Sequence, residues 1–265
     1  MKTYITQRNS PCRKALGRLA LASALTLATA GAGVAQDTCP IPVRDFEPDP
    51  TATTTFLPKW CTWRTQGNNP FFKLRPGYQI VLEDDEEKVI ITVLDQTKVV
   101  AGVRTRVVVE DEYEKDGDEL IRVERSLNYY ARCEETNSIF YFGEDVDMFD
   151  EDGNLINHEG AWLAGRNGAK PGIAMPGTPL VGAKYYEEIA PADSALDKNQ
   201  IVAVDPNCTV DDQHFRRPCV TTVGTNDCND DEDEKVYVAG IGIVYDNGLL
   251  ITDYGFIDDD DEDDD

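Results

Sequence analysis

The sequence is short of basic residues and has almost no histidine. It contains 25 lysines and arginines against 50 aspartates and glutamates, a formal net charge of −25, and only two histidines, His158 and His214. Such an excess of carboxylates repels nucleic acid and anionic membrane surfaces and attracts cations. The composition therefore argues against a nucleic-acid-binding protein and favours divalent cations or a basic protein as partners.

The motifs of several common enzymes and metal sites are also missing. The chain has no G-x-S-x-G, no phosphate-binding P-loop, no G-x-G-x-x-G after an expected strand and no C-x-x-C pair. A Ser-His-Asp triad would have to use His158 or His214, and a pair of carboxylates carries little information among 50 acids. The sequence thus favours a non-enzymatic protein, with an enzyme of unknown class as the alternative.

Residues 1–35 have the pattern of a secretory signal peptide. Residues 1–18 carry five positive charges and no acid, and residues 19–34 are uncharged and rich in leucine and alanine. Small residues stand at the −3 and −1 positions of a cleavage site before Gln36. We expect secretion to the periplasm or the extracellular space, without a lipid anchor, because no lipidation cysteine follows the cleavage point. No later segment is long and apolar enough to be a transmembrane span, and without this leader the net charge becomes −30.

Six of the seven cysteines lie beyond that leader, which is an even number. In an oxidising compartment they are expected to form three disulfides. Proximity in the sequence favours Cys39–Cys61, together with either Cys208–Cys219 or Cys219–Cys228. A zinc or copper site that includes His214, between Cys208 and Cys219, is the alternative. The six are Cys39, Cys61, Cys133, Cys208, Cys219 and Cys228.

Residues 78–163 have the pattern of a series of β-strands. Apolar and polar residues alternate between 120 and 132, and Asp-Gly or Asn-Gly pairs at 152–153 and 247–248 are typical of tight hairpin turns. Strands of this length joined by short turns form an antiparallel meander. One face of these strands is apolar and the other charged, so the sheet is expected to curve around a core or to be covered on one side. For residues 69–257 we predict a mainly β domain, a single antiparallel curved sheet or an open, barrel-like meander.

Four segments depart from this pattern. Residues 36–68 precede the strands as an N-terminal extension. Residues 160–182 are rich in glycine and proline and are predicted to form a long, ordered loop without regular structure. Residues 205–234 are acidic and contain three cysteines, which indicates an insertion stapled by disulfides. The tail 258–265 consists of eight carboxylates and is expected to stay disordered, because it has no apolar residue and repels itself.

Several short motifs resemble those of a known protein family. They include YFGED at 141–145, EGAWLAG at 159–165 and GAKPGIAMP at 168–176. Over residues 69–244 the chain resembles an uncharacterised family of exported bacterial β-rich proteins, many of which are lipoproteins. The resemblance implies a β-rich fold and an envelope or extracellular location, and it assigns no catalytic residue. The chain departs from the family in its cysteine-bearing acidic segment, its acidic tail and its lack of a lipidation cysteine.

The first candidate metal site is an acidic stretch that resembles a calcium loop. Aligned on Gly153, the residues Asp150, Asp152 and Glu159 take positions 3, 5 and 12 of an EF-hand, which supplies oxygen ligands to Ca²⁺. Position 1 is Met148, which has no carboxylate, and the flanking residues do not have a helical pattern. A hairpin with an Asp-Gly turn is the competing interpretation.

A second candidate metal site lies where Asp227, Asn229, Asp231 and Asp233 place an oxygen ligand at every other residue. Dense carboxylates attract hard divalent cations such as Ca²⁺, with the weak affinity of about 10⁻⁴–10⁻³ M that extracellular calcium modules show. The alternative is a solvated run of charge.

These observations lead to one expected function and two alternatives. We expect an exported, non-enzymatic binding or structural protein that associates weakly with divalent cations, chiefly Ca²⁺, through its acidic segments. A carrier or chaperone for an apolar, lipid-like ligand is the first alternative, with Trp162, Ile173 and Met175 lining an opening; their other role would be as buried core. In the second alternative the charge reflects only a saline habitat, where acidic surfaces keep proteins soluble.

Overall fold

The computed structural model describes residues 39–56, 58–117, 119–228 and 232–257. The expected signal peptide and the acidic tail lie outside these residues. Within them the chain forms strands joined by turns and by three short 3₁₀ helices, Val43–Asp45 (η1), Pro58–Trp60 (η2) and Pro191–Asp193 (η3). None of the helices in this part of the chain is long and apolar enough to cross a lipid bilayer.

The strands are numbered along the chain, and five of them, β5 to β8 and β14, supply most of the length of the sheet. In order they are Trp63–Arg64 (β1), Asn68–Asn69 (β2), Phe72–Lys73 (β3), Tyr78–Glu83 (β4), Glu87–Val100 (β5), Val103–Asp116 (β6), Glu119–Cys133 (β7), Ile139–Phe149 (β8), Leu155–Asn157 (β9), Trp162–Leu163 (β10), Lys170–Met175 (β11), Lys184–Tyr186 (β12), Glu188–Ile189 (β13), Asp197–Asp205 (β14), Cys208–Val210 (β15), Gln213–Phe215 (β16), Cys219–Asn226 (β17), Glu232–Val238 (β18), Gly242–Asp246 (β19) and Leu249–Phe256 (β20).

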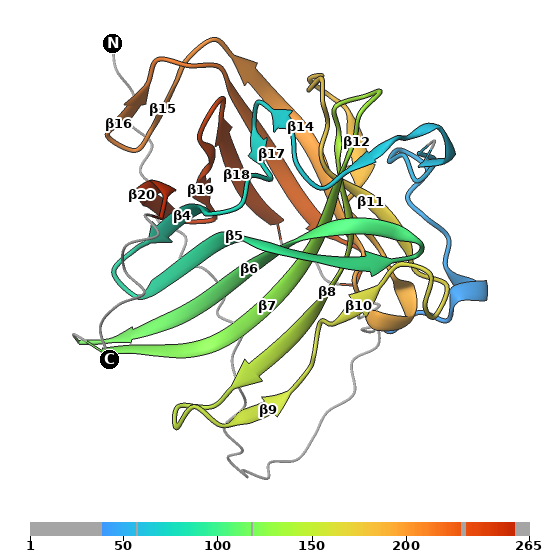
Figure 1. Ribbon diagram of the computed structural model, residues 1–265, viewed down its shortest axis with the longest axis horizontal. Helices are drawn as coiled ribbons and strands as arrows, with labels where there is room; N and C mark the ends of the chain where they lie inside the picture. Colours follow the sequence, from blue (N-terminus) through green and yellow to red (C-terminus); the bar gives the residue numbers. More distant parts are fainter. Residues whose placement is uncertain (1–38, 57, 118, 229–231, 258–265) are drawn as a thin grey trace, which may run out of the picture. The chain divides into compact units, whose positions relative to one another are not determined.

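Most of these strands form one antiparallel sheet that nearly closes on itself (Figure 1). Along the sheet the order is β12-β14-β17-β18-β19-β20-β4-β5-β6-β7-β8-β11-β13. The two end strands, β12 and β13, are separated in the chain by Glu187 alone, so one continuous segment pairs with β14 at one edge and with β11 at the other. The predicted mainly β fold with a single curved antiparallel sheet is confirmed.

Tight turns connect several neighbouring strands. Between β5 and β6 the two loop residues, Ala101 and Gly102, have positive φ angles of 48° and 81°. Asn247 and Gly248 form the loop between β19 and β20, with φ angles of 44° and 115°. Positive φ at both central residues is what a type I′ turn requires, and the twist of that turn matches the twist of antiparallel strands. The Asn-Gly pair in the sequence therefore explains the last hairpin.

The segment before the sheet packs on its outer face. Phe56 and Trp63 lie edge-on against rings of β8, with the centroids of Phe56 and Phe140 5.7 Å apart. The ring centroid of Trp63 is 5.1 Å from that of Phe140 and 5.2 Å from that of Phe142. Burial of rings of this size removes a large apolar area from water, so these contacts fix the path of the N-terminal segment.

A group of charged and polar side chains anchors the same segment farther along the sheet. The Asp49 carboxylate accepts a hydrogen bond from Lys184 at 2.7 Å, and the Asp49 backbone N–H donates to the Tyr186 hydroxyl at 2.8 Å. Lys198 forms an ion pair with Asp227 beside them. The pKa of the Asp49 carboxyl is held well below its usual value, chiefly by the hydrogen bond from Lys184.

Three disulfides join the described cysteines: Cys39–Cys228, Cys61–Cys133 and Cys208–Cys219. The predicted number of disulfides is confirmed, and so is the pair Cys208–Cys219. The predicted pair Cys39–Cys61 is wrong, because the N-terminal segment runs across the sheet and places Cys39 beside the end of β17 and Cys61 beside the end of β7. Three disulfides fit an extracellular or periplasmic location.

Two segments predicted to lie outside the regular sheet contribute strands to it. Residues 160–182 contain β10 and β11, and both pair with β8. A glycine-rich sequence ordinarily argues against a strand. Here Gly172 lies within β11 because a Cβ atom at this position would overlap the carbonyl oxygens of Tyr186 and Glu187. Residues 205–234 likewise contain β17, which lies between β14 and β18 inside the sheet, so this stretch is not simply an insertion.

Trp162 offers a test of the packing of residues 160–182. Its side chain is 3% exposed and meets Tyr141 edge-on at a centroid distance of 5.4 Å. Trp162→Ala should lower the free energy of unfolding by about 3–5 kcal/mol, as for a large buried aromatic side chain, in a urea titration. Trp60→Ala, at a side chain that is 77% exposed, is the matched control and should have little effect. A loss below about 1 kcal/mol for Trp162→Ala would contradict the packing.

The disulfides should differ in what their removal costs. Cys39 and Cys228 are 189 residues apart in the sequence, and Cys208 and Cys219 are 11 apart. A disulfide restricts the unfolded chain more when it closes a longer loop. Replacing both cysteines by alanine should therefore cost about 5 kcal/mol of unfolding free energy for the first pair and about 3 kcal/mol for the second. The opposite ranking in denaturant titrations would show that loop closure does not dominate their effect.

Candidate functional site

The first predicted calcium loop is a hairpin turn in the structure. The Asp150 carboxylate accepts hydrogen bonds from the backbone N–H groups of Asp152 (3.0 Å) and Asn154 (2.8 Å), which closes the turn between β8 and β9. These bonds hold the pKa of the Asp150 carboxyl below its usual value, with the Asn154 backbone bond the largest cause. Asp152 and Glu159 are exposed and do not converge on Asp150.

The second predicted calcium site is also divided between different surroundings. Asp227 accepts hydrogen bonds from the Tyr186 hydroxyl (2.5 Å) and from Lys198, so it belongs to the anchor of the N-terminal segment. Asn229 and Asp231 lie outside the described residues. Asp233, on β18, lies 3.5 Å from the ammonium group of Lys235.

Close approaches of potential metal ligands are rare in the described part of the chain. Ligand atoms of three or more His, Cys, Asp or Glu side chains come within 4.8 Å of one another at one place there, Cys61, Cys133 and Glu135. Those two sulfur atoms are joined in a disulfide, so they are not thiolate ligands. His214 Nδ1 lies 2.7 Å from the Thr209 hydroxyl, while Cys208 and Cys219 are disulfide-bonded, which argues against the alternative metal site at these residues.

The residues suggested to line an apolar opening lie in or against the core. Trp162 and Met175 are buried, and Ile173 is partly buried and packs against the same cluster. Their surroundings match the core role that the sequence left as the alternative. The Trp162 Nε1 atom has no hydrogen-bond partner.

Acidic and polar side chains of β6, β7 and β8 share the inner face of the sheet. Glu110 lies opposite Ser126, Glu112 opposite Glu124, and Asn128 opposite Glu144. Directly opposed residues of an antiparallel pair point to the same side. These polar side chains therefore form one wall of the interior.

Strands β14, β17, β18 and β19 form a second wall. Ile201 lies opposite Thr222, Thr222 opposite Lys235, and Lys235 opposite Asp246. The Lys235 ammonium group is 3.1 Å from the Asp246 carboxylate. Register thus places an isoleucine, a threonine, a lysine and an aspartate on the same side of four neighbouring strands.

The two walls face each other across the interior of the sheet. Burial raises the pKa of the Glu110 carboxyl to about 8, with Glu112 on its own strand and Asp246 on β19 raising it further and Lys235 on β18 lowering it. These charges act on Glu110 from opposite walls, so they share one interior. We call the following set the acidic interior: Glu110, Glu112, Glu124, Glu144, Glu187, Glu188, Asp197, Asp233 and Asp246.

The acidic interior favours the protonated form of its carboxyl groups. Burial, followed by the charge of Glu124, raises the pKa of Glu144 to about 8. Burial also raises the pKa of Glu187 to about 7, although Lys235 opposes that shift. The pKa of Glu188 lies well above its usual value, again because of burial first and then the charge of Asp197. Several of these groups therefore hold a proton near neutral pH.

Two hydroxyl groups in the interior are buried without a hydrogen-bond partner. They belong to Tyr185, which is 3% exposed, and Thr222, which is 1% exposed. Tyr185 lies opposite Asn199 on β14, and the Asn199 side chain donates to Glu187 at 2.6 Å, so Tyr185 points toward the acidic interior. Buried polar groups are nearly always hydrogen-bonded in folded proteins. Two hydroxyls without partners (orphan hydroxyls) on the inner face of the sheet, that of Tyr185 near Glu187 and that of Thr222 opposite Lys235, indicate a place for a ligand.

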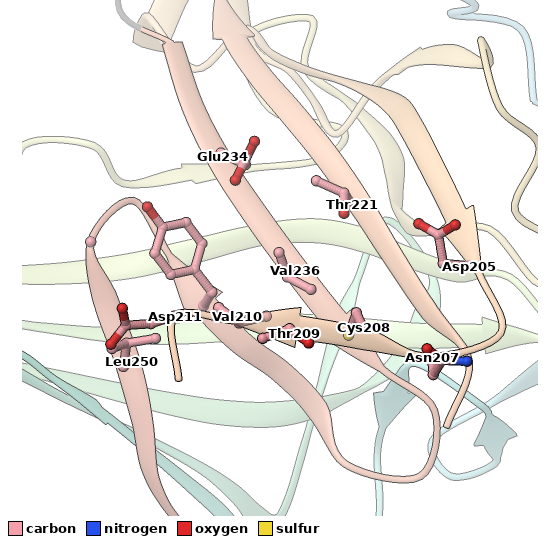
Figure 2. Close-up of a pocket in the computed structure, with 12 residues that line it drawn as sticks. Asp205, Asn207, Cys208, Thr209, Val210, Asp211, Thr221, Glu234, Val236 and Leu250 are labelled. Carbon is pink, nitrogen blue, oxygen red and sulfur yellow. The ribbon is translucent and has the colours of Figure 1, made fainter. Parts of the chain in front are cut away.

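A separate groove of about 700 Å³ lies on the outer face of the sheet (Figure 2). Strand β15 and the residues next to it form one side, and Thr221, Glu234 and Val236 of β17 and β18 form the floor. These three residues alternate with the inward-facing ones, so the groove does not open into the acidic interior. Its carboxylates, which include Asp205 and Asp211, are exposed to water, and it lacks the buried orphan groups of the interior.

Comparisons of the chain with protein-family models, with curated proteins and with solved structures found no match.

The sequence did not reveal the acidic interior. Between 120 and 132 it shows that Glu124, Ser126 and Asn128 share a face, and a charged face is ordinarily turned to water. In the structure this face points inward, because the sheet nearly closes and rings from the N-terminal segment cover β8 from outside. To predict that this face points inward, one needs the register of β6 against β7 and the closure of the sheet, and the sequence pattern gives neither.

Glu110 offers a test of this electrostatic arrangement. The pKa of a glutamate in the unfolded chain is about 4.5 and that of folded Glu110 is about 8. Between these values the folded state holds a proton that the unfolded state has lost, so the free energy of unfolding falls as the pH rises from 4.5 to 8. Glu110→Gln should stabilise the protein by about 1–3 kcal/mol at pH 8.5, and by much less at pH 4.5, because the amide stays neutral.

Glu114→Gln provides the control for that substitution. Glu114 is on the same strand but its side chain is exposed, so the variant should follow the wild type at both pH values in urea titrations. If Glu110→Gln and Glu114→Gln behave alike at pH 8.5, Glu110 does not carry a buried charge.

Proposed function

We propose that the chain is an exported binding protein that holds a cationic ligand in the acidic interior of its sheet. The observation that carries this proposal is the set of nine carboxyl groups that share one interior, of which Asp246, Asp233 and Glu187 act on the ammonium group of Lys235. When these carboxyl groups ionise, their mutual repulsion is relieved by a counter-cation. A cation bound there stabilises the folded state by mass action.

Export is part of the same proposal. The leader pattern in residues 1–35 supports secretion, and the three disulfides support an oxidising compartment. Free divalent cations such as Ca²⁺ are among the ligands to be tested, since carboxylate oxygens suit hard cations. The carboxyl groups of the interior favour a cationic ligand over a lipid-like one. An apolar chain bound there would displace water from the carboxyl groups without replacing its hydrogen bonds.

Cation binding should depend strongly on pH. Ionisation of Glu110, Glu144 and Glu187, with pKa values of about 8, 8 and 7, is expected to precede or accompany binding, so protons are released as the cation enters. Affinity for a bound cation should rise by about tenfold or more between pH 6 and pH 8.5. Calorimetry in buffers of different ionisation enthalpy measures both the affinity and the number of protons released.

A matched pair of variants tests the location. Glu144→Gln/Glu187→Gln neutralises two interior groups, and Asp205→Asn/Asp211→Asn removes the same charge from the exposed outer groove. The interior variant should lose the pH-dependent binding and the groove variant should keep it. If no cation in a panel of Ca²⁺, Mg²⁺ and spermidine binds in a way that depends on the interior pair, the proposed function is wrong.

A further inference from the structure

The interior carboxylates are not arranged as ligands of a single metal ion. Ca²⁺ and Mg²⁺ bind oxygen atoms at about 2.0–2.6 Å, which brings the oxygens of one site within a few ångströms of each other. Among the described residues, the acidic interior contains no three carboxylates whose oxygen atoms come within 4.8 Å of one another. The negative charge is distributed along the interior instead of being gathered at one point.

Lys235 shows which kind of cation these surroundings stabilise. Burial by itself lowers the pKa of its ammonium group, but Asp246, Tyr237, Asp233 and Glu187 outweigh this and raise it well above the usual value. The ammonium group lies 3.1 Å from Asp246 and 3.5 Å from Asp233. A primary alkylammonium ion is therefore already held in this interior by the chain itself.

The orphan hydroxyls suit an amine. An ammonium group has three N–H donors and no acceptor, so one that pairs with a carboxylate still has donors to satisfy. Tyr185 Oη and Thr222 Oγ1 are buried acceptors without a partner. Thr222 lies directly opposite Lys235 on the neighbouring strand, and the charge of Glu187 acts on Tyr185. Tyr185 Oη thus lies near a carboxylate that an amine would pair with, and Thr222 Oγ1 lies beside the strand that bears the Lys235 ammonium group.

Two tyrosine rings lie near carboxylates of the acidic interior. Tyr130 and Tyr141 are stacked, with ring centroids 4.7 Å apart and planes inclined by 21°. The charges of Glu144, Glu187 and Glu188 all act on this pair of tyrosines. Ring faces attract alkylammonium ions and pack against methylene groups, whereas a hydrated divalent metal ion gains less from them.

The groups of the acidic interior differ in their exposure to water. As a whole residue Glu188 is buried, whereas Asp233, Lys235 and Asp246 are partly exposed, with side-chain exposures of 36%, 29% and 24%. Water therefore reaches the carboxylates more freely near Asp233 than near Glu188. A linear chain of methylene groups with several ammonium groups has spaced charges, as the acidic interior has spaced carboxylates.

Building on the function proposed above, we propose that the ligand is a linear aliphatic polyamine, whose ammonium groups pair with successive carboxylates of the acidic interior and with the orphan hydroxyls of Tyr185 and Thr222. The tyrosine rings would contact the methylene groups between the charges.

The first experiment compares ligands by calorimetry at pH 8.5 on the full mature chain. Spermidine should bind with a dissociation constant at least tenfold lower than those of Ca²⁺, Mg²⁺ and n-butylamine, the last of which carries a single ammonium group. Glu144→Gln/Glu187→Gln should weaken spermidine binding at least tenfold, and Asp205→Asn/Asp211→Asn should change it less than about twofold. Thermal unfolding of both variants confirms that each is folded.

Three other results would contradict the polyamine proposal, the proposed function or both. If Ca²⁺ binds more tightly than spermidine and loses affinity in the interior variant, the polyamine assignment is wrong while the proposed function stands. If n-butylamine binds as well as spermidine, the claim of several paired ammonium groups fails. If the two double variants weaken spermidine binding equally, the binding is a non-specific effect of charge, and both proposals fail.

Thr222→Val provides a second, independent test. The threonine hydroxyl makes no hydrogen bond in the unliganded protein, so replacing it by a methyl group of similar size should leave the unfolding midpoint unchanged or slightly raise it. The same variant should bind spermidine several-fold more weakly, because an N–H donor of the ligand loses its acceptor. Wild-type affinity in a folded Thr222→Val protein would remove Thr222 from the site.

Discussion

The repulsion among carboxyl groups enclosed by the sheet is the constraint on which the rest of the structure depends. Burial raises the pKa of Glu110, Glu144 and Glu187 into the range from about 7 to about 8. An ionised carboxylate in such surroundings is costly unless it is paired with a cation and hydrogen-bonded. Lys235 supplies one positive charge, and bound protons neutralise several of the carboxylates near neutral pH. The interior is therefore able to exchange protons for a positively charged ligand.

The architecture holds these groups together against their repulsion. The segment that contains β12, Glu187 and β13 joins the two edges of the sheet and carries Glu187 and Glu188 into the interior. Outside, rings of the N-terminal segment pack on β8, and disulfides fix that segment at Cys39 and Cys61. Apolar packing thus lies partly on the outer face of the sheet, while polar groups lie on its inner face.

The sequence was sufficient for the class of fold but not for the site. Strand alternation and the Asn-Gly turn at 247–248 depend on neighbours in the sequence, and both were predicted correctly. The pairing of Cys39 with Cys228, and of Glu110 on β6 with the charges on β18 and β19, depends on sheet closure over long sequence separations. Local patterns do not carry that information. The acids that resemble calcium loops in the sequence are therefore different residues from most of those that the sheet encloses.

Titration of the glutamate side chains by carbon-13 NMR tests the central claim most directly. The carboxyl carbon of each glutamate shifts when its proton leaves, and Glu110→Gln and Glu144→Gln assign two of the signals. The account predicts that these two signals titrate near pH 8 in the unliganded protein, and that a bound cation moves their titration to lower pH, since positive charge favours the ionised form. Titration of both signals between about pH 4 and pH 5, the ordinary range for glutamate, would contradict it.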